Sequence, residues 1–216
     1  MALRIVELHY SPEYSSNIYV IGNESEDAIV IDPGSNEGNA LSNYLSKHHN
    51  GRLRAIFLTH GHIDHIAGLS SLENDAPVYI GQNELKYLSE PKYNLSRDFG
   101  LEPFIYDSTN VNALADKERI AFEDLGFDAE IIETPFHTTG SICIYLKNEK
   151  ALFSGDTLFH LGVGRSDLPG GNERKMTDSL KKLSKLPNDV KVYPGHGKTT
   201  KMEIERKYNP YLTGLY

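Results

Sequence analysis

Apolar residues along the chain follow two patterns. Short apolar runs, which are typical of strands, alternate with segments in which apolar positions recur every three or four residues, as in helices. The first pattern predicts strands over 3–9, 17–21, 28–31, 53–58, 129–133, 142–146, 151–153 and 190–193. The second predicts helices near 41–48, from 67 to 72, from 173 to 186 and from 201 onward. The stretch 91–125 has no clean period, and we expect loops and short pieces there that form one wall of a cleft.

Length and composition fit one domain over residues 1–216. The chain has 216 residues, 39% of them hydrophobic, so it can bury a full core without disulfides. Its single cysteine, Cys143, lies in the apolar run 141–146. We expect this thiol to pack within a strand rather than to act as a nucleophile. No linker, repeat or low-complexity tract interrupts the pattern.

Charge and hydropathy exclude several classes of protein. The first residues lack a signal-type apolar block, and no run approaches the roughly 18 apolar residues of a membrane span. The net charge of -8 argues against a general nucleic-acid binder. We therefore expect a cytoplasmic monomer or small homo-oligomer that binds neither nucleic acid nor membrane.

The candidate chemistry begins with the six residues His60-Gly61-His62-Ile63-Asp64-His65, which follow the predicted strand 53–58. In an extended loop, side chains at i and i+2 point the same way, so His60 and His62 can share one metal ion. Asp64 and His65 then turn toward a second ion. A polar loop with chance histidines is the alternative.

Three more ligand-type residues argue against chance. His137, Asp156 and His196 each lie just after an apolar run of their own. Imidazoles and carboxylates gathered at strand ends have few uses other than binding metal. The sequence therefore predicts a dinuclear metal site.

These motifs resemble the metallo-β-lactamase fold superfamily, whose signature His-x-His-x-Asp-His stands here at residues 60–65. The resemblance covers nearly the whole chain, with further motifs in order at 31–34, 134–138, 154–157 and 194–197. It implies a four-layer αββα sandwich of α/β class. Phe136 stands where relatives usually carry Gly, and we expect this ring beside His137 to narrow the cleft or stiffen the loop.

The resemblance also assigns roles to the ligand-type residues. It implies that one metal is held by His60, His62 and His137, that the other is held by Asp64, His65 and His196, and that Asp156 bridges both. Asp32, which a turn alone would explain, is then expected to orient the metal loop through hydrogen bonds. Of the remaining histidines, His9, His48 and His49 are expected to be surface or packing residues, while His160, four residues after Asp156, is closer to the site.

Two divalent ions in such a site would supply a hydroxide at neutral pH, because shared coordination lowers the pKa of water from 15.7 toward about 7. A bridging hydroxide attacking an acyl or phosphoryl group makes hydrolysis the expected reaction, with Asp64 and Asp156 in the catalytic centre. Zinc is the first choice for both ions, and iron or manganese are the alternatives. A domain in which metals only staple the fold remains a further alternative, but such sites are typically closed and rich in cysteine.

The branches of the superfamily differ at particular residues. Redox di-iron members carry Glu where His62 stands, and β-lactamases use a Cys ligand or lack the carboxylate at Asp156. Nucleases of the tRNA-processing type usually have longer chains with a basic arm. The segments 164–171, 193–197 and 205–210 look most like small bacterial glyoxalase II-like hydrolases. Mononuclear iron persulfide dioxygenases share the Gly-Arg-Ser/Thr-Asp stretch and are the second choice.

A thioester such as S-lactoylglutathione suits this site, because a thiolate with a pKa of about 8.5 leaves without a strong acid. True glyoxalases II grip glutathione partly with a helical C-terminal extension, whereas twenty residues follow His196 here, so a smaller or different thioester stays open. Arg165 stands where those enzymes place a Lys that contacts glutathione. It can bind a substrate carboxylate, or it can form a structural ion pair with Asp167.

Overall fold

A computed structural model describes residues 4–9, 16–23, 26–35, 37–49, 52–72, 75–98 and 102–215. The chain divides into two compact units, each built on a six-stranded sheet. The first unit comprises Met1–Ile80 and Leu85–Ala113, and the second comprises Gly81–Glu84 and Leu114–Tyr216. A single domain over 1–216 stays a prediction.

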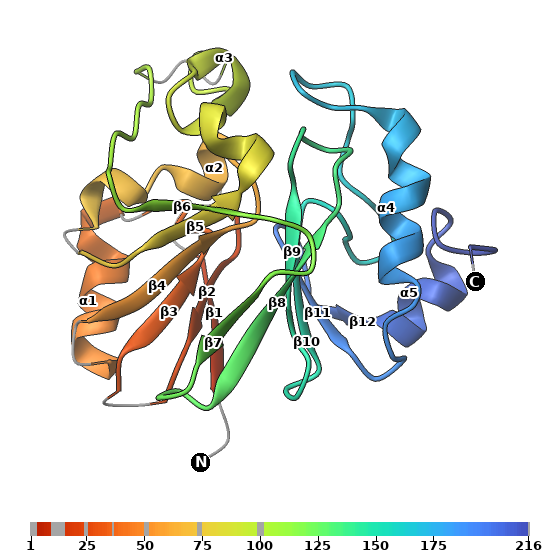
Figure 1. The fold of residues 1–216 in the computed structure, drawn as a ribbon, viewed down its shortest axis with the longest axis horizontal. Helices are drawn as coiled ribbons and strands as arrows, with labels where there is room; N and C mark the ends of the chain where they lie inside the picture. The colour runs from red at the N-terminus through yellow and green to blue at the C-terminus, as the bar shows by residue number, and fades with distance from the viewer. Residues whose placement is uncertain are drawn as a thin grey trace. The chain divides into compact units, whose positions relative to one another are not determined.

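The sheet of the first unit follows chain order (Figure 1). Its strands are β1 (Ile5–Leu8), β2 (Ile18–Ile21), β3 (Ala28–Ile31), β4 (Leu53–Leu58), β5 (Val78–Gly81) and β6 (Val111–Leu114). The first three strands pair antiparallel, whereas β3 with β4 and β4 with β5 pair parallel. Because parallel neighbours need a crossover, the segments between these strands carry helices.

The helical segments of this region are mostly short. They are η1 (Glu37–Asn39), α1 (Ala40–His48), α2 (Ile63–Ile66), η2 (Leu69–Ser71), η3 (Gln82–Leu88) and α3 (Pro91–Asn94). Leu41 and Leu45, one turn apart on α1, pack into a buried cluster with Val20, Val30 and Ile56 of the sheet. The helix α1 thereby covers one face of the first sheet.

The second sheet has the order β12-β11-β10-β9-β8-β7. Its strands are β7 (Arg119–Phe122), β8 (Phe127–Glu133), β9 (Ile142–Leu146), β10 (Ala151–Gly155), β11 (Lys191–Pro194) and β12 (Thr200–Lys201). The pair β10 and β11 is parallel, and the other pairs are antiparallel. The helices η4 (Glu173–Lys175) and α4 (Met176–Leu183) connect the parallel pair, and α5 (Met202–Tyr208) follows β12.

One buried cluster of the second unit lies between its sheet and these helices. Leu180 and Leu183 of α4 and Met202 of α5 belong to one buried cluster with Leu152 and Val192 of the sheet. Figure 1 shows α4 and α5 along the same side of the sheet. None of the helices in the described segments is both long and apolar enough to cross a membrane.

The structure corrects some boundaries. The first strand begins at Ile5, and Leu3 of the predicted strand lies outside the described residues. The strand β5 was not predicted, and β6 and β7 lie in the stretch where we expected loops and short pieces. Both strands leave most of their residues partly or fully exposed, so they lack the apolar alternation that reveals a strand in sequence. The helix expected from 67 to 72 instead begins at Ile63 and continues as a 3-10 turn over Leu69–Ser71.

Candidate metal centre

Parallel pairing brings the first group of polar residues together. Asp32 follows β3 and Thr59 follows β4, and the carboxyl ends of parallel strands share one edge of the sheet. The Thr59 N–H donates to Asp32 Oδ1 at 2.7 Å, and the Thr59 hydroxyl donates to Asp32 Oδ2 at 2.6 Å. Both residues are almost fully buried, so these bonds satisfy a carboxylate that water cannot reach.

The histidine run is only partly an extended loop. The backbone is extended at His62, with φ -70° and ψ 147°, and α2 then begins at Ile63. The expected extended geometry therefore fails for Asp64 and His65, which lie on a helical turn. That turn directs His65 Nδ1 to Asp32 Oδ2 at 2.8 Å, while His65 Nε2 lies 3.7 Å from Asp64 Oδ2.

Asp32 sets the protonation of two imidazoles. An ionised carboxylate only accepts hydrogen bonds, so His65 Nδ1 carries the proton and Nε2 keeps its lone pair. The single hydroxyl proton of Thr59 goes to Asp32, so Thr59 Oγ1 accepts from His60 Nδ1 at 3.2 Å. His60 Nε2 is then a ligand atom too.

The spacing within this group fits a metal ion. His60 Nε2 lies 3.1 Å from His62 Nδ1. Two nitrogens bound to one tetrahedral zinc at about 2.0–2.1 Å would be about 3.3 Å apart. All three imidazoles are buried, and the ligand atoms of His60 and His65 lie within 4.8 Å of each other. We refer to His60, His62, Asp64 and His65 as the first ligand set.

A glycine allows the Asp32 turn to pack against α2. Asp32 itself has a left-handed φ of 49°, and the turn continues through Pro33 to Gly34. A Cβ on Gly34 would lie 1.8 Å from the carbonyl oxygen of Asp64, a distance that no side chain can adopt. Only glycine therefore lets the turn approach the helix that carries the ligands.

The second ligand set consists of His137, Asp156 and His196, in the second unit. They follow β8, β10 and β11, which run in the same direction because β9 pairs antiparallel with both β8 and β10. Strands of one direction end at one edge of the sheet, so the three residues meet there. Asp156 Oδ2 lies 3.4 Å from His137 Nε2 and 3.6 Å from His196 Nε2.

Backbone groups orient this second set. His137 Nδ1 donates to the Arg165 carbonyl at 2.7 Å, which leaves Nε2 as the ligand atom. The Gly164 N–H donates to the Asp156 carbonyl at 3.0 Å. A Cβ on Gly164 would lie 2.0 Å from that oxygen and 3.0 Å from His137 Nδ1, so glycine is again required.

The donor chemistry of both sets fits divalent metal ions. Imidazole nitrogens with their Nδ1 or Nε2 lone pairs in place, together with carboxylates, are ordinary ligands of zinc, iron and manganese. A single oxygen, Asp156 Oδ2, lies at ligand-to-ligand distance from two imidazoles. That arrangement suits a carboxylate shared by two ions.

The remaining expectations have mixed outcomes. Cys143 is fully buried in β9, and burial raises the pKa of its thiol to about 11, which agrees with packing rather than nucleophilic chemistry. The Phe136 ring is fully buried, and its expected effect on the cleft or on the loop that carries His137 stays a prediction. His49 is buried with Nδ1 3.1 Å from the Asn23 carbonyl, whereas His9 is exposed.

Sequence reasoning missed Thr59, which links Asp32 to His60. Its position directly before the histidine run was visible, but threonine at a strand end is common and carries no specific signal. The Arg165 carbonyl was missed for a different reason. Backbone acceptors leave no mark on the residue type, so only the structure reveals them.

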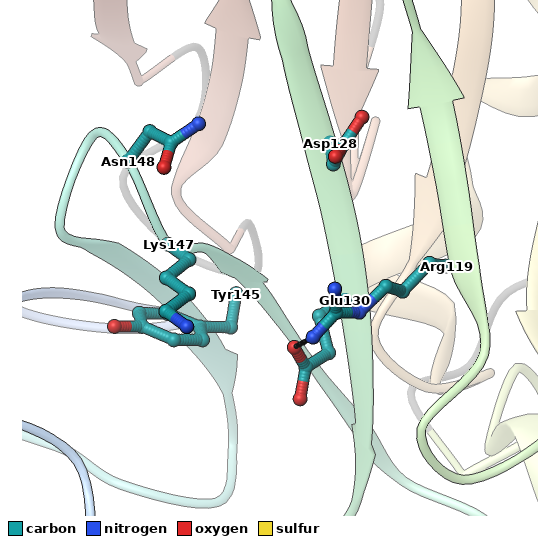
Figure 2. Close-up of a pocket in the computed structure, with 6 residues that line it drawn as sticks. All are labelled: Arg119, Asp128, Glu130, Tyr145, Lys147 and Asn148. Carbon is teal, nitrogen blue, oxygen red and sulfur yellow. Dashed lines mark hydrogen bonds and ion pairs between the residues drawn. The ribbon is translucent and has the colours of Figure 1, made fainter.

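The hollow shown in Figure 2 has none of the ligand residues in its lining. Its volume is about 220 Å³, and it is lined by Arg119, Asp128, Glu130, Tyr145, Lys147 and Asn148 of β7, β8, β9 and the following turn. Arg119 donates to Glu130 at 2.7 Å across the two strands. The lining contains no imidazole, and it does not resemble a hydrolytic centre.

Residues 11–196 match the family model of the metallo-beta-lactamase superfamily. The chain therefore belongs to the metallo-β-lactamase superfamily, whose members bind divalent metal ions. Its two sheets with their helices match the sandwich fold of that superfamily, as the resemblance implied.

Relatives of similar length support a metallo-hydrolase. "Probable metallo-hydrolase YqgX" of Bacillus subtilis is 34% identical over 204 residues, covering 93% of each chain. "Hydroxyacylglutathione hydrolase GloC" of Haemophilus influenzae is 33% identical over 202 residues, covering 92% of this chain and 93% of that one. The protein is a metallo-hydrolase of the superfamily.

Solved structures give the same picture. BLEG-1, described as a B3 metallo-β-lactamase, has a TM-score of 0.86 and 32% identity over 98% of this chain and all of its own. TTHA1623, solved in a di-iron-bound form, has a TM-score of 0.80 and 31% identity over 96% of this chain and all of its own.

Proposed function

We propose that the protein hydrolyses thioesters, with the two ligand sets acting together on two divalent metal ions. The observation that carries this proposal is the position of Asp156 Oδ2, 3.4 Å from His137 Nε2 and 3.6 Å from His196 Nε2. A carboxylate oxygen between two imidazoles suits a bridging ligand. The proposed set is His60, His62, Asp64, His65, His137, Asp156 and His196, with zinc as the first choice and iron or manganese as alternatives.

When bound, two such ions would supply a hydroxide nucleophile at neutral pH and would polarise the acyl oxygen. The residues of the chain keep the ligands in the state that this chemistry needs. Asp32 holds protons on His60 and His65 at the nitrogens that face away from the ligand atoms. The Arg165 carbonyl does the same for His137. Asp64 and Asp156 supply the carboxylates, whose charge balances that of the cations.

The thioester assignment rests on the leaving group. A thiolate with a pKa of about 8.5 can depart without a proton donor, and neither ligand set needs to supply a general acid. The relative from Haemophilus influenzae is named a hydroxyacylglutathione hydrolase, which supports the same class of substrate. S-lactoylglutathione is therefore the first compound to test, and smaller thioesters are the second.

Arg165 is the proposed anchor for an anionic substrate. Its guanidinium donates to both carboxylate oxygens of Asp167, at 2.6 and 2.7 Å, and lowers the pKa of Asp167 to about 2. Both side chains are about two-thirds exposed, so the pair is screened by water and contributes little to stability. The guanidinium can donate the same two hydrogen bonds to a substrate carboxylate instead.

Two measurements test the function. Purified protein with its metal content measured should release thiol from S-lactoylglutathione or a smaller thioester without consuming oxygen. Steady oxygen uptake with glutathione persulfide, together with no thiol release from either thioester, would instead indicate the persulfide dioxygenase.

Arg165→Ala then tests the anchor. If Arg165 binds substrate, the variant should raise KM about tenfold for an anionic thioester and little for a neutral one, since a charge-assisted hydrogen bond is lost. The melting temperature should be nearly unchanged. Equal effects on both substrates with a lower melting temperature would assign Arg165 a structural role. A cytoplasmic location, a monomer or small homo-oligomer, and the absence of nucleic-acid and membrane partners likewise remain proposals.

A further inference from the structure

The segment Glu205-Arg206-Lys207-Tyr208-Asn209-Pro210 has no part in the proposed chemistry, yet it contains a fully buried carboxylate. Glu205 lies on α5 and is 0% exposed. A carboxylate in such a place is costly unless it is fully hydrogen-bonded. Its partners therefore indicate what the residue does.

Four groups surround the Glu205 carboxylate. Oε1 accepts from the Thr200 hydroxyl at 2.7 Å and lies 3.4 Å from His160 Nδ1. Oε2 accepts from the Leu161 N–H at 2.9 Å and from Asn209 Nδ2 at 2.8 Å. The Leu161 and Asn209 groups can only donate, so Oε2 must be an acceptor. Thr200 and His160 can each donate or accept, so the Oε1 side tolerates a change of polarity.

Three of the four partners come from the two segments that follow ligands of the second set. His160 and Leu161 belong to the turn after Asp156, and Thr200 lies four residues after His196. The Phe159 N–H donates to the Gly162 carbonyl at 2.9 Å and closes the turn, in which Leu161 has a left-handed φ of 59°. Glu205 supplies the acceptor for the backbone N–H of this strained residue.

Asn209 reinforces the same turn from the end of α5. Its Nδ2 donates to the Gly162 carbonyl at 3.0 Å as well as to Glu205. Asn209 is fully buried, like Glu205. The two residues, one helical turn apart, hold the 159–162 turn against α5.

When the turn is held in this position, its Phe159 ring contacts His196, which is one of the proposed ligands. The Phe159 ring meets the His196 imidazole edge-on, with ring centroids 6.0 Å apart and an interplanar angle of 78°. The His196 side chain is 39% exposed, whereas that of His137 is buried. Because part of the His196 imidazole faces solvent, the contact with the Phe159 ring has a larger share in setting its orientation.

We propose that Glu205 is a positioning residue for His196. It ties the turn after Asp156 and the segment after His196 to α5, and the turn sets Phe159 against the imidazole. The relevance to metal binding rests on the proposed function. The effect of Glu205 on the position of His196 is independent of the proposed function.

The test compares Glu205→Ala, Glu205→Gln and a control, Glu203→Gln, which changes an exposed carboxylate on the same helix. The amide of Gln can accept from Leu161 and Asn209 with its oxygen and donate to Thr200 with its nitrogen, so this variant should keep the turn. The Ala variant should lose it. If Glu205→Ala does not fold, Asn209→Asp takes its place, because a carboxylate there removes the donors to Glu205 and Gly162.

The first readout is the imidazole NMR signal of His196 in metal-free protein, assigned with His196→Gln. It should shift in Glu205→Ala, remain near wild type in Glu205→Gln, and be unchanged in the control. The second is a zinc titration against a competing chelator, in which the Ala variant should bind one of two ions about 10–100-fold more weakly. This loss should be partly restored in Glu205→Gln.

A folded Glu205→Ala with unchanged His196 signals and unchanged metal affinities would overturn the positioning role. A general loss of stability would not imitate the expected result, because the metal-free signal is read in folded protein. If the wild-type protein hydrolyses no thioester, the proposed function fails, while the His196 signal still decides the role of Glu205.

Discussion

The two ligand sets are built in different ways. The first lies within six consecutive residues, and its imidazoles are buried, with His60 and His65 oriented by the side chains of Thr59 and Asp32. The second combines residues from three separate strand ends, and its histidines differ in exposure. A backbone carbonyl and the glycine backbone hold it in place.

The two sets therefore orient their metal ligands in two different ways. In the first set, one buried carboxylate controls the protonation of two imidazoles, so a single substitution should disturb both. In the second set, each histidine has its own support, and Asp156 is the residue the two share. We therefore expect Asp32 and Asp156 to be the most sensitive positions of their sets.

The largest effect is expected for Asp156→Ala. The variant should bind less of both metal ions and lose about 10³-fold or more in kcat/KM, since the ions that Asp156 would help to hold would stabilise the developing charge by several kcal/mol. Elemental analysis and thioester kinetics would measure this. Asp128→Ala, which removes an exposed carboxylate on β8, is the control. Full retention of both ions in Asp156→Ala would rule out a bridging role.

Asp32→Ala tests the shared support of the first set. The variant leaves the buried Thr59 N–H and His65 Nδ1 without their acceptor, which should lower the free energy of unfolding by about 2–4 kcal/mol. Metal affinity should fall about 10–100-fold, because the imidazoles lose their orientation. Denaturant unfolding of metal-free protein separates the two effects. Unchanged metal affinity in a folded variant would contradict the comparison.

A pair of glycine substitutions tests whether close backbone approach matters equally in the two sets. Gly34→Ala and Gly164→Ala would each place a Cβ about 2 Å or less from a carbonyl oxygen, so each should cost about 1–3 kcal/mol. Gly162→Ala is the matched control, because nothing lies within 4 Å of its added Cβ. Thermal unfolding would show the difference, and equal melting temperatures in all three variants would argue against it.

The smallest expected effect concerns His49, a buried histidine of the first unit that is not a proposed ligand. Burial lowers the pKa of His49 below its usual 6.5, and the charge of His48 lowers it further. The hydrogen bond to the Asn23 carbonyl acts in the opposite direction and raises this pKa. Below about pH 6.5 the unfolded chain therefore binds more protons than the folded one, and stability falls as pH drops.

The matching variant is His49→Gln, which can still donate to the Asn23 carbonyl. Its unfolding free energy should decline less than that of the wild type between about pH 7 and pH 5. Urea unfolding at several pH values measures the slope. Parallel slopes for both proteins would assign the acid sensitivity to other histidines.

The order of strands and helices was largely readable from the sequence, because long apolar runs can only be buried. The strands at 28–31, 53–58, 142–146 and 151–155 are fully apolar or nearly so, and each was predicted within two residues. Among the strands that escaped prediction, β6 and β7 are short and mostly exposed, so edge pairing rather than burial explains them, whereas β5 is short but mostly buried. The start of α2 inside the histidine run also escaped prediction, since a single helical turn has no periodicity.

The sequence by itself was enough to pick out the candidate residues of both ligand sets, since imidazoles and carboxylates at the ends of apolar runs can be recognised without a structure. Their orientation was decided by tertiary structure. Distances between backbone segments far apart in the chain decide three features of the site. They are the hydrogen bonds of Thr59, the use of the Arg165 carbonyl as an acceptor, and the need for glycine at positions 34 and 164. Strand pairing sets those distances, and no local pattern of residues records them. For the same reason, Glu205 shows its partners only once α5 is folded against the turn after Asp156.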